Sequence, residues 1–528
     1  MAQKLTISRR ELVGGALGAG LAATAGGLLL WKGGGKPANH AFVMRGDQQP
    51  RYGGRIRVSS IASSTADTLD PAKGSLSTDY ARHNMVYNGL TRYDGLLNAQ
   101  LELAETLESS DRQLWRVKLR KDVAFHDGKP LTSADVVYSL LRHKLPETAS
   151  KVKTIADQFA EVRADGADEV LIRLTGPNAD LPEILAQTQF LIIRDGTKNF
   201  HAANGTGPYR CTVFQPGVRT VGVRNHHYWK HGRPFLDEIE LIAIPDEVSR
   251  VNALLSGDVH LVNAVDPRST KRIKESGTHA VTETQSGLYT DLVMQQGMLP
   301  TSNPHFVLAM KYLLDRELIR RALFRNYAVI ANDHPIPPNH RYFNSEIPQR
   351  QYDPDRAKYH IRQAGLTGAR LPMFASPAAE ASVDMASVVQ EYGSRIGVNF
   401  AVNRVPSDGY WSAHWMKHPL TFGNINPRPT ADLLFSLFFK SDAEWNEAHW
   451  NNPQFDRLLV EARGEADEAR RKQLYGEMQQ LVHDQAGVAI PVFISLIDGH
   501  DLRLKGLHPI PIGGLMGYMF ADQVWWDG

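Results

Sequence analysis

The sequence predicts an α/β protein of mixed α+β type that is built from several domains. The chain has 528 residues, of which 42% are hydrophobic and 22% charged, as is ordinary for a globular protein. Segments that alternate apolar and polar residues, as half-buried strands do, are interspersed with amphipathic segments of helical period. No internal repeat or low-complexity tract follows residue 50, and at roughly 150 residues per domain this length fits two to four domains.

Charge and cysteine content narrow the class of protein. The formal net charge is +2, and lysine and arginine are spread among aspartate and glutamate, so no nucleic-acid partner is expected. Cys211 is the single cysteine, so no disulfide can form within the chain. We interpret Cys211 as a small buried hydrophobic residue, and we expect stability to come from a large core.

Residues 1–31 have the pattern of an export signal. Arg9 and Arg10 precede an uncharged run rich in glycine and alanine, which resembles a twin-arginine signal, so we expect the twin-arginine export machinery as a partner and a periplasmic location. The alternative is a single transmembrane helix, because about 20 uncharged residues can span a bilayer. No clean A-x-A site follows the run, so retention by an uncleaved N-terminal anchor stays open. Residues 32–50 are predicted to form a flexible tether.

Individual strands and helices can be predicted from residue 55 onward. Residues 55–58 and 113–119 alternate as strands do, and Asp127-Gly128 supplies a turn. Thr132 and Asp135 have the spacing of a capping box that opens a helix. Further strands are predicted at 169–174 and 210–214, and amphipathic helices at 452–463 and 467–484.

Four stretches of the chain carry motifs that occur together in one known family. They are residues 103–136 with Phe125-His126-Asp127-Gly128, residues 205–259 with Gly205-Thr206-Gly207-Pro208-Tyr209, residues 309–338 with Asp315-Arg316-Glu317, and residues 352–491 with Tyr352-Asp353-Pro354. Their order and spacing agree from about residue 51 to 528. The set resembles family 5 of the extracellular solute-binding proteins, the oligopeptide, dipeptide and nickel receptors of ABC importers.

The resemblance implies a two-lobed periplasmic binding protein of the three-domain, two-strand-hinge type. It divides the chain into lobe 1 (51–78, 205–297 and 496–528), an extra domain packed on lobe 1 (79–204), and lobe 2 (298–495). Such proteins close around a ligand by hinge motion. It also implies a monomeric receptor that delivers a peptide or peptide-like ligand to the permease of an ABC transporter in the inner membrane.

Some motifs resemble catalytic or metal sites but have structural explanations. His126-Asp127-Gly128 suggests a catalytic dyad, although a hairpin turn before a capped helix accounts for it. His226, His227 and His231 lack the H-E-x-x-H pattern of a zinc site. We therefore predict no catalytic residue, metal ligand or cofactor. A periplasmic hydrolase that uses the same cleft and a ligand sensor stay open as alternatives.

The candidate ligand-binding residues lie in one aromatic stretch, in which four of the nine tryptophans fall between Tyr410 and Trp450. They are Trp411, Trp415, Asn424, Asn426, Arg428, Asp432 and Trp445. Asn426 stands where dipeptide and oligopeptide receptors carry an aspartate that pairs with the amino group of the peptide. Arg428 is suited to a bidentate pair with a carboxylate or phosphate, and Asp432 supplies a negative charge if the alignment slips. An opine-like or sugar-phosphate conjugate and a nickel chelate therefore stay open as ligands, the latter with His414 and His418.

Overall fold

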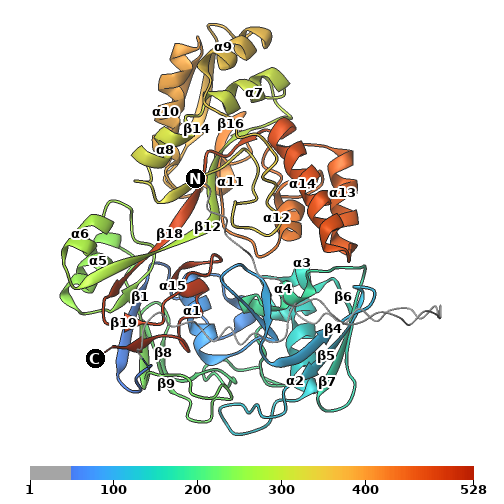
Figure 1. Cartoon of the computed structure of the whole chain (residues 1–528), viewed down its shortest axis with the longest axis vertical. Helices are drawn as coiled ribbons and strands as arrows, with labels where there is room; N and C mark the ends of the chain where they lie inside the picture. The colour runs from blue at the N-terminus through green and yellow to red at the C-terminus, as the bar shows by residue number, and fades with distance from the viewer. Residues whose placement is uncertain (1–48, 528) are drawn as a thin grey trace, which may run out of the picture.

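The computed structural model describes residues 49–527 (Figure 1). The predicted signal, and the predicted tether as far as residue 48, lie outside the described residues. Strands and helices are mixed throughout, and two masses of the molecule are connected by long strands. None of the helices between residues 49 and 527 combines the length and the apolar character needed to cross a bilayer.

The main sheet has ten strands and extends through both masses. Its order is β16-β12-β18-β11-β1-β10-β9-β8, with β13 beside β18 and β17 beside β12. The strands are β1 (Arg55–Ser60), β8 (Tyr209–Gln215), β9 (Arg219–Arg224), β10 (Glu238–Ala243), β11 (Leu261–Val262), β12 (His279–Met294), β13 (Ala328–Ile330), β16 (Leu420–Ile425), β17 (Val488–Ala489) and β18 (Val492–Asp501). The predicted strand at 55–58 is confirmed, because Ile56 and Val58 are fully buried on one face of β1.

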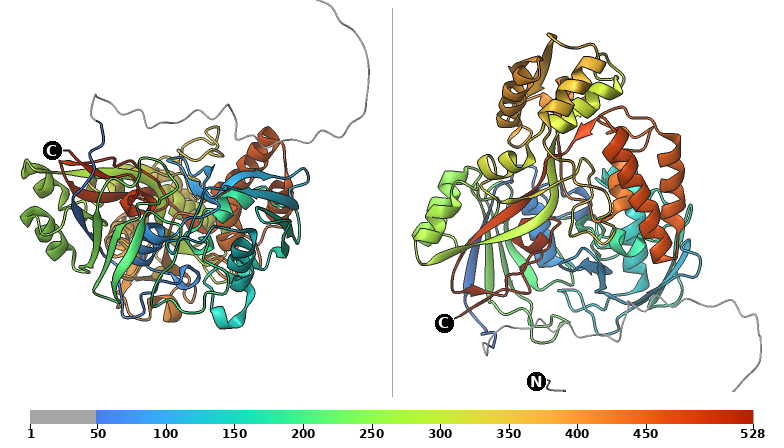
Figure 2. Two further views of the ribbon diagram at one scale, coloured as in Figure 1. Left: turned by 90° about the horizontal axis from the view of Figure 1, so that it is seen from below. Right: turned by 45° about the horizontal axis from the view of Figure 1, so that its top comes forward.

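Strands β12 and β18 connect the two masses and lie side by side (Figure 1, Figure 2). The first half of β12 pairs with β18 from His279↔Asp501 to Thr284↔Leu496. The register then shifts, and the second half of β12 pairs with β16 from Tyr289↔Ile425 onward. Each of the two strands therefore contributes to the packing on both sides of the connection.

Lobe 1 is built around β1, β10 and helix α1 (Ser77–Val86). The predicted boundary between residues 78 and 79 falls inside α1, whose Ala81 and Met85 pack in one cluster with Ile56. Helices α5 (Glu247–Ser256) and α6 (Thr270–Glu275), the pair β19 (Leu504–Lys505) and β20 (Trp525–Trp526), and α15 (Gly514–Gly517) complete this part. Residues 515–518 all have positive φ, and this turn places the Tyr518 ring 5.3 Å from the Tyr80 ring.

The extra domain has its own four-stranded antiparallel sheet in the order β4-β5-β7-β6. Its elements are β4 (Ala104–Glu108), β5 (Leu114–Leu119), β6 (Phe159–Ala164), β7 (Glu169–Leu174), α2 (Ser133–Leu141), α3 (Lys153–Ala156) and α4 (Leu181–Leu185). The capping box of Thr132 and Asp135 is confirmed at the start of α2. His126 bonds to the carbonyl of Gly207 and Gly128 has a φ of 85°, as expected for a structural turn. The hairpin of β2 (Thr91–Tyr93) and β3 (Ala99–Leu101) projects from this region.

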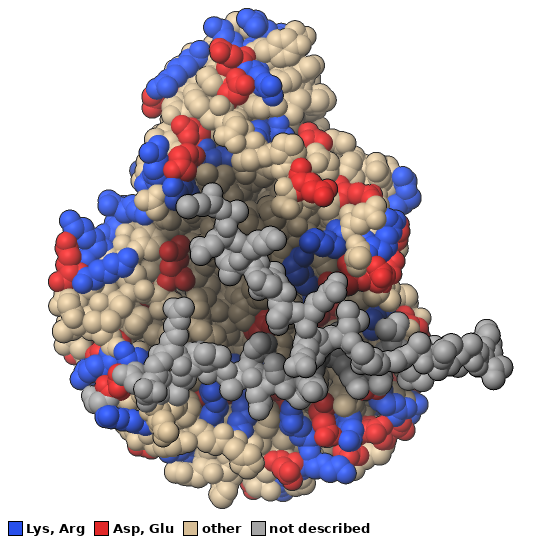
Figure 3. Space-filling model, viewed as in Figure 1, with Lys and Arg blue, Asp and Glu red and all other residues tan. Residues whose placement is uncertain are grey.

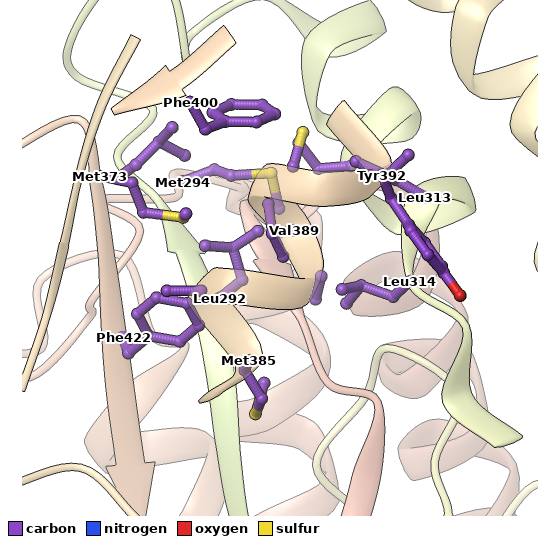
Figure 4. Close-up of a cluster of buried hydrophobic side chains, with 14 of the residues drawn as sticks. Leu292, Met294, Leu313, Leu314, Met373, Met385, Val389, Tyr392, Phe400 and Phe422 are labelled. Carbon is purple, nitrogen blue, oxygen red and sulfur yellow. The ribbon is translucent and has the colours of Figure 1, made fainter. Parts of the chain in front are cut away.

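Lobe 2 packs helices against the second half of β12 and against β16. Its elements are α7 (Pro304–Leu313), α8 (Arg316–Ala322), α9 (Pro354–Gln363), β14 (Arg370–Ala375), α10 (Ser382–Arg395), β15 (Asn399–Arg404), α11 (Tyr410–Ala413), α12 (Ala431–Phe438), α13 (Pro453–Gly464) and α14 (Glu468–Gln485). Figure 4 shows one of its cores, where Leu292 of β12, Phe422 of β16 and Val389 of α10 meet. The two predicted helices near the end are confirmed as α13 and α14, which Asn452 and Asp467 cap through their side chains.

Candidate ligand-binding cleft

A pocket lies where strand β12, the hairpin of the extra domain and lobe 2 meet. Figure 3 shows this face of the molecule hollowed between lobe 2 above and the remainder below. The lining residues are Leu96, Leu97, Gly287, Pro335, Ile336, Pro337, Asn339, His340, Pro427, Arg428, Thr430, Ala431, Leu434 and Pro511. They come from segments far apart in sequence, so the pocket exists only when the lobes are arranged as they are here.

The pocket is mostly apolar, with a few polar groups at fixed positions. Leu96 and Leu97 come from the turn between β2 and β3, and Pro511 comes from the C-terminal segment of lobe 1. Burial lowers the pKa of His340 to about 3, and the nearby charge of Arg341 lowers it further, so the His340 imidazole is neutral at neutral pH. Arg428 is therefore the one charged side chain among the lining residues. An apolar pocket with few polar groups is typical of a small-molecule site.

Arg428 is held by the backbone of its own loop, directly after β16. Its Nη1 donates to the carbonyl oxygens of Asn426 and Pro427, each at 3.2 Å, and its Cζ lies 5.4 Å from the centre of the Phe438 ring. Burial lowers the pKa of the Arg428 guanidinium, and the Tyr289 hydroxyl opposes this shift. No carboxylate pairs with Arg428 anywhere between residues 49 and 527. A half-buried cation that pairs with no anion among the described residues is suited to receive an anionic group from a ligand.

Tyr80 of α1 lies within reach of the charge of Arg428. Burial raises the pKa of the Tyr80 hydroxyl, and the charge of Arg428 partly opposes that rise. Gln189 donates to the Tyr80 hydroxyl at 3.3 Å. Neither Tyr80 nor the leucine pair at 96 and 97 was among the predicted site residues. Two leucines in a turn directly after Asp94-Gly95 were the sequence signal for a binding role, since turn tips are usually polar.

The three predicted tryptophans lie outside the pocket lining. Trp411 and Trp445 are 41% and 44% exposed. Trp411 packs edge-on against Trp415, and Trp445 stacks on Phe438, the same ring that Arg428 contacts. The Trp415 indole Nε1 donates to Glu447 Oε2 at 2.7 Å. Of the three tryptophans, only Trp445 contacts a residue that Arg428 also contacts, namely Phe438.

The predicted asparagines and aspartate occupy three different environments. The Asn424 amide donates to Thr290 Oγ1 at 2.9 Å, across the β12–β16 pair. Asn426 is exposed beside the pocket, and its carbonyl accepts from Arg428. Asp432 is buried in the first turn of α12, where Arg463 Nε donates to its Oδ1 at 3.0 Å. The Asp432 carboxylate is therefore already paired within lobe 2.

The histidines considered for metal binding do not form a larger ligand set. His414 Nδ1 and His418 Nε2 lie 3.2 Å apart, and both rings stack on Phe374 rather than line the pocket. Within the part of the chain that the structure describes, no group of three or more histidine, cysteine, aspartate or glutamate side chains could hold a metal ion.

Comparisons with known proteins identify the family. The family model described as bacterial extracellular solute-binding proteins, family 5 middle, matches residues 98–447. The glutathione-binding protein GsiB of Pectobacterium atrosepticum is 25% identical over 470 residues, which cover 85% of this chain and 90% of GsiB. The heme-binding protein A of Haemophilus influenzae is 26% identical over 479 residues, covering 82% of this chain and 86% of that protein. The oligopeptide-binding protein AppA of Bacillus subtilis is 24% identical over 500 residues, covering 85% and 88%.

Solved structures agree with the fold. CtaP of Listeria monocytogenes superposes with a TM-score of 0.80 at 20% identity and covers 90% of this chain and 100% of its own. HbpA2 of Haemophilus parasuis gives a TM-score of 0.77 at 18% identity, with 90% and 100% covered. These likenesses confirm the predicted α/β class and the two-lobed periplasmic binding protein fold. Because the family model covers well over half of the sequence, this chain belongs to family 5 of the bacterial extracellular solute-binding proteins.

Proposed function

We propose that this protein is the receptor of an ABC importer and that it captures an anionic, peptide-like small molecule between its lobes. The observation that carries the proposal is Arg428, a half-buried guanidinium that pairs with no carboxylate between residues 49 and 527 and that lines an apolar interlobe pocket. A ligand carboxylate or phosphate completes the hydrogen bonds of Arg428, and the apolar part of the ligand lies against Leu96, Leu97 and Pro337. The ligand is released unchanged to the permease, because no side chain in the pocket lining is arranged as a nucleophile with a base.

The names of similar proteins support this ligand class. GsiB is a glutathione-binding protein, AppA is an oligopeptide-binding protein, and AgaA of Agrobacterium tumefaciens was solved with agropinic acid. Glutathione, peptides and agropinic acid all carry carboxylates, which a guanidinium recognises through two parallel hydrogen bonds. A nickel chelate receives less support, since the histidine pair of His414 and His418 does not line the pocket.

The proposal includes the location and the organisation of the chain. Family members are extracellular or periplasmic solute receptors, and we assign export to the arginine pair of the predicted signal, with or without cleavage. We also propose that the protein is a monomer. In it, lobe 2 closes onto lobe 1 and the extra domain by bending of β12 and β18. The sensor alternative involves the same capture step but a different membrane partner.

Native mass spectrometry of the protein purified from its own cells tests the proposal. We expect a bound small molecule that carries a carboxylate or phosphate, and we expect the same mass after prolonged incubation at 25 °C. A ligand mass that splits into two products during incubation would indicate the hydrolase instead. A bound molecule without an anionic group, or one that Arg428→Ala retains fully, would contradict the role given to Arg428.

A further inference from the structure

A cluster of buried ions joins the extra domain to lobe 2 outside the pocket. Arg471 Nη2 lies 2.7 Å from Asp180 Oδ1, and Arg341 lies 3.4 Å from the same oxygen and 3.1 Å from Glu183 Oε1. The Asp180 and Arg471 side chains are 1% and 4% exposed. Asp180 and Glu183 stand at the start of α4 in the extra domain, whereas Arg341 and Arg471 belong to lobe 2.

Backbone contacts at the same place show that the two parts meet closely. The Ala179 amide donates to the Arg463 carbonyl at 2.9 Å. A Cβ atom on Gly464 would lie 3.1 Å from the Pro177 side chain, so a larger residue at 464 would push the two parts away from each other. These contacts connect α13 of lobe 2 with the segment before α4, and opening of the cleft has to break them.

The ion cluster is adjacent to the ligand pocket and shares its wall. Thr430 lines the pocket and caps helix α12, in which Asp432 pairs with Arg463 beside the cluster. His340 also lines the pocket and directly precedes Arg341. Arg471 further donates to the Tyr342 hydroxyl at 2.9 Å, which fixes the same loop from its other side. Asp180 therefore holds the loop of His340 and Arg341, one part of the pocket wall, in place without lining the pocket itself.

Charge within the cluster is balanced. Glu183 pairs with Arg341, Asp432 pairs with Arg463, and Asp180 receives Arg471 together with Arg341. Burial opposes ionisation of Asp180, yet Arg471 and Arg341 together hold its pKa below the usual value. In the open form these side chains regain water, so the desolvation of the ions and their attraction oppose each other on closing. Removing Asp180 leaves Arg471 buried without its carboxylate, and removing Arg471 leaves Asp180 with only the more distant Arg341, so either change penalises the closed form.

We propose that Asp180 of the extra domain is the residue that Arg471 and Arg341 of lobe 2 contact when the cleft closes. We propose further that this contact populates the closed form before any ligand binds. The extra domain is then part of the closing mechanism, and Asp180 is a positioning residue for ligand capture. The inference rests on the proposed function only in that closure is the step that traps the ligand.

Distances between spin labels test this proposal on the whole chain without any ligand. Val460→Cys on α13 and Ala160→Cys on β6 place labels at exposed sites of lobe 2 and the extra domain, in a Cys211→Ser background. Co-purified ligand is removed by unfolding and refolding, and native mass spectrometry verifies its loss. The variants are Asp180→Asn, Arg471→Gln and the double variant. The control is Asp165→Asn, an exposed aspartate of the same domain that pairs with Arg116.

We expect a short-distance population in the ligand-free parent protein. Asp180→Asn and Arg471→Gln, which change opposite sides of the contact, should each raise the open-to-closed ratio at least tenfold. The double variant should be less open than the sum of the two single effects implies. It removes both Asp180 and Arg471, so neither charge remains buried without the other. Asp165→Asn should match the parent. A parent protein with only the long distance, or single variants with the distance distribution of the parent, would overturn the proposal. No ligand enters the measurement, so its outcome is independent of the role of Arg428.

Discussion

The Trp415 indole donates to Glu447 at 2.7 Å and so joins the exposed aromatic segment to a pair of buried carboxyl groups. Glu447 faces Asp291 of β12, and any side chain at Gly423 would overlap both carboxyl groups. Neither side-chain oxygen of Asp291 has a hydrogen-bond partner in the described part of the chain. Burial raises the pKa of Asp291 to about 7, and burial together with the charge of Asp291 raises the pKa of Glu447 well above its usual value. Below about pH 7 the folded pair therefore keeps bound protons that it loses on unfolding.

This pair predicts a pH dependence of stability with a definite sign. A carboxyl group whose folded pKa lies above its unfolded value of about 4 stabilises most below that value and progressively less as pH rises to the folded pKa. Because of Asp291, the free energy of unfolding should fall as the pH rises from about 4 to about 7. The slope should reach about 1.4 kcal/mol per pH unit. Asp291→Asn should remove this slope. Unfolding of wild type and variant in guanidinium chloride at pH 5, 6, 7 and 8 gives the free energy of unfolding of each protein. The difference between the two at each pH cancels the contribution of the groups that the substitution does not affect.

The control for that experiment is Asp442→Asn, since Asp442 is exposed in the loop before Glu447. Its difference from wild type should stay constant from pH 5 to pH 8. A constant difference for Asp291→Asn as well would show that Asp291 is ionised in the folded protein.

Arg428 predicts a specific pattern of ligand affinity. Calorimetric titration with the ligand identified from the native protein should show a loss of roughly 10- to 100-fold for Arg428→Ala, as a charge-assisted hydrogen bond is worth on the order of 1.5–3 kcal/mol. Arg428→Lys should recover only part of that loss, because an ammonium group cannot form the planar two-bond contact. Arg404→Ala, a change at an exposed arginine of β15, should bind like wild type. Equal affinities for all four proteins would place Arg428 outside the binding site.

The hairpin tip of the extra domain should contribute apolar contact to the ligand. Leu96 is 61% exposed although it lines the pocket, so Leu96→Ala should change the free energy of unfolding by no more than about 0.5 kcal/mol. Covering the Leu96 side chain with ligand is worth about 1–2 kcal/mol, so affinity should fall by roughly 5- to 30-fold. Leu299→Ala is the matched change, because Leu299 is 83% exposed and does not line the pocket. Similar affinities for the two variants would separate the hairpin from ligand binding.

The arginine pair at the start of the chain predicts a dependence of export on both residues. Replacing Arg9 and Arg10 together with lysine should leave the protein in the cytoplasm, as the twin-arginine machinery recognises the paired guanidinium groups. Fractionation followed by immunoblotting measures the distribution. The double change Arg45→Lys and Arg51→Lys keeps the same charge and should not affect export. Normal periplasmic recovery of the Arg9/Arg10 variant would rule out a twin-arginine signal.

Local signals explain why parts of the fold could be predicted from the sequence. The helices at 453–464 and 468–485 start one residue after the predicted bounds and end one residue after them, since Asn452 and Asp467 cap them and Leu458, Leu474 and Met478 form their buried faces. The strand at 55–60 and the capping box at 132–135 were predictable for the same reason. The family motifs added the two-lobed arrangement, which no local pattern contains.

Contacts made between distant segments could not be predicted in this way. Asp291 and Glu447 meet only because β12 and β16 pair in the register that sets Asp291 opposite Gly423. Trp411 and Trp415 have helical spacing, which does not indicate whether their shared face points to a ligand or to solvent. Leu96 lines the pocket because lobe 2 lies over the hairpin, and the two leucines of the turn do not indicate which part of the chain covers them.

The two connecting strands also determine how the molecule amplifies motion. Because β12 and β18 run next to each other at one side of the molecule, they define a single bending axis, and α13, α14 and α4 lie at the opposite side (Figure 1). Lobe 2 then behaves as a lever: a small rotation at the strands becomes a large displacement at Asp180 and Arg471. A rotation that opens the cleft therefore also separates those two side chains, which couples loss of the Asp180–Arg471 contact to opening of the pocket.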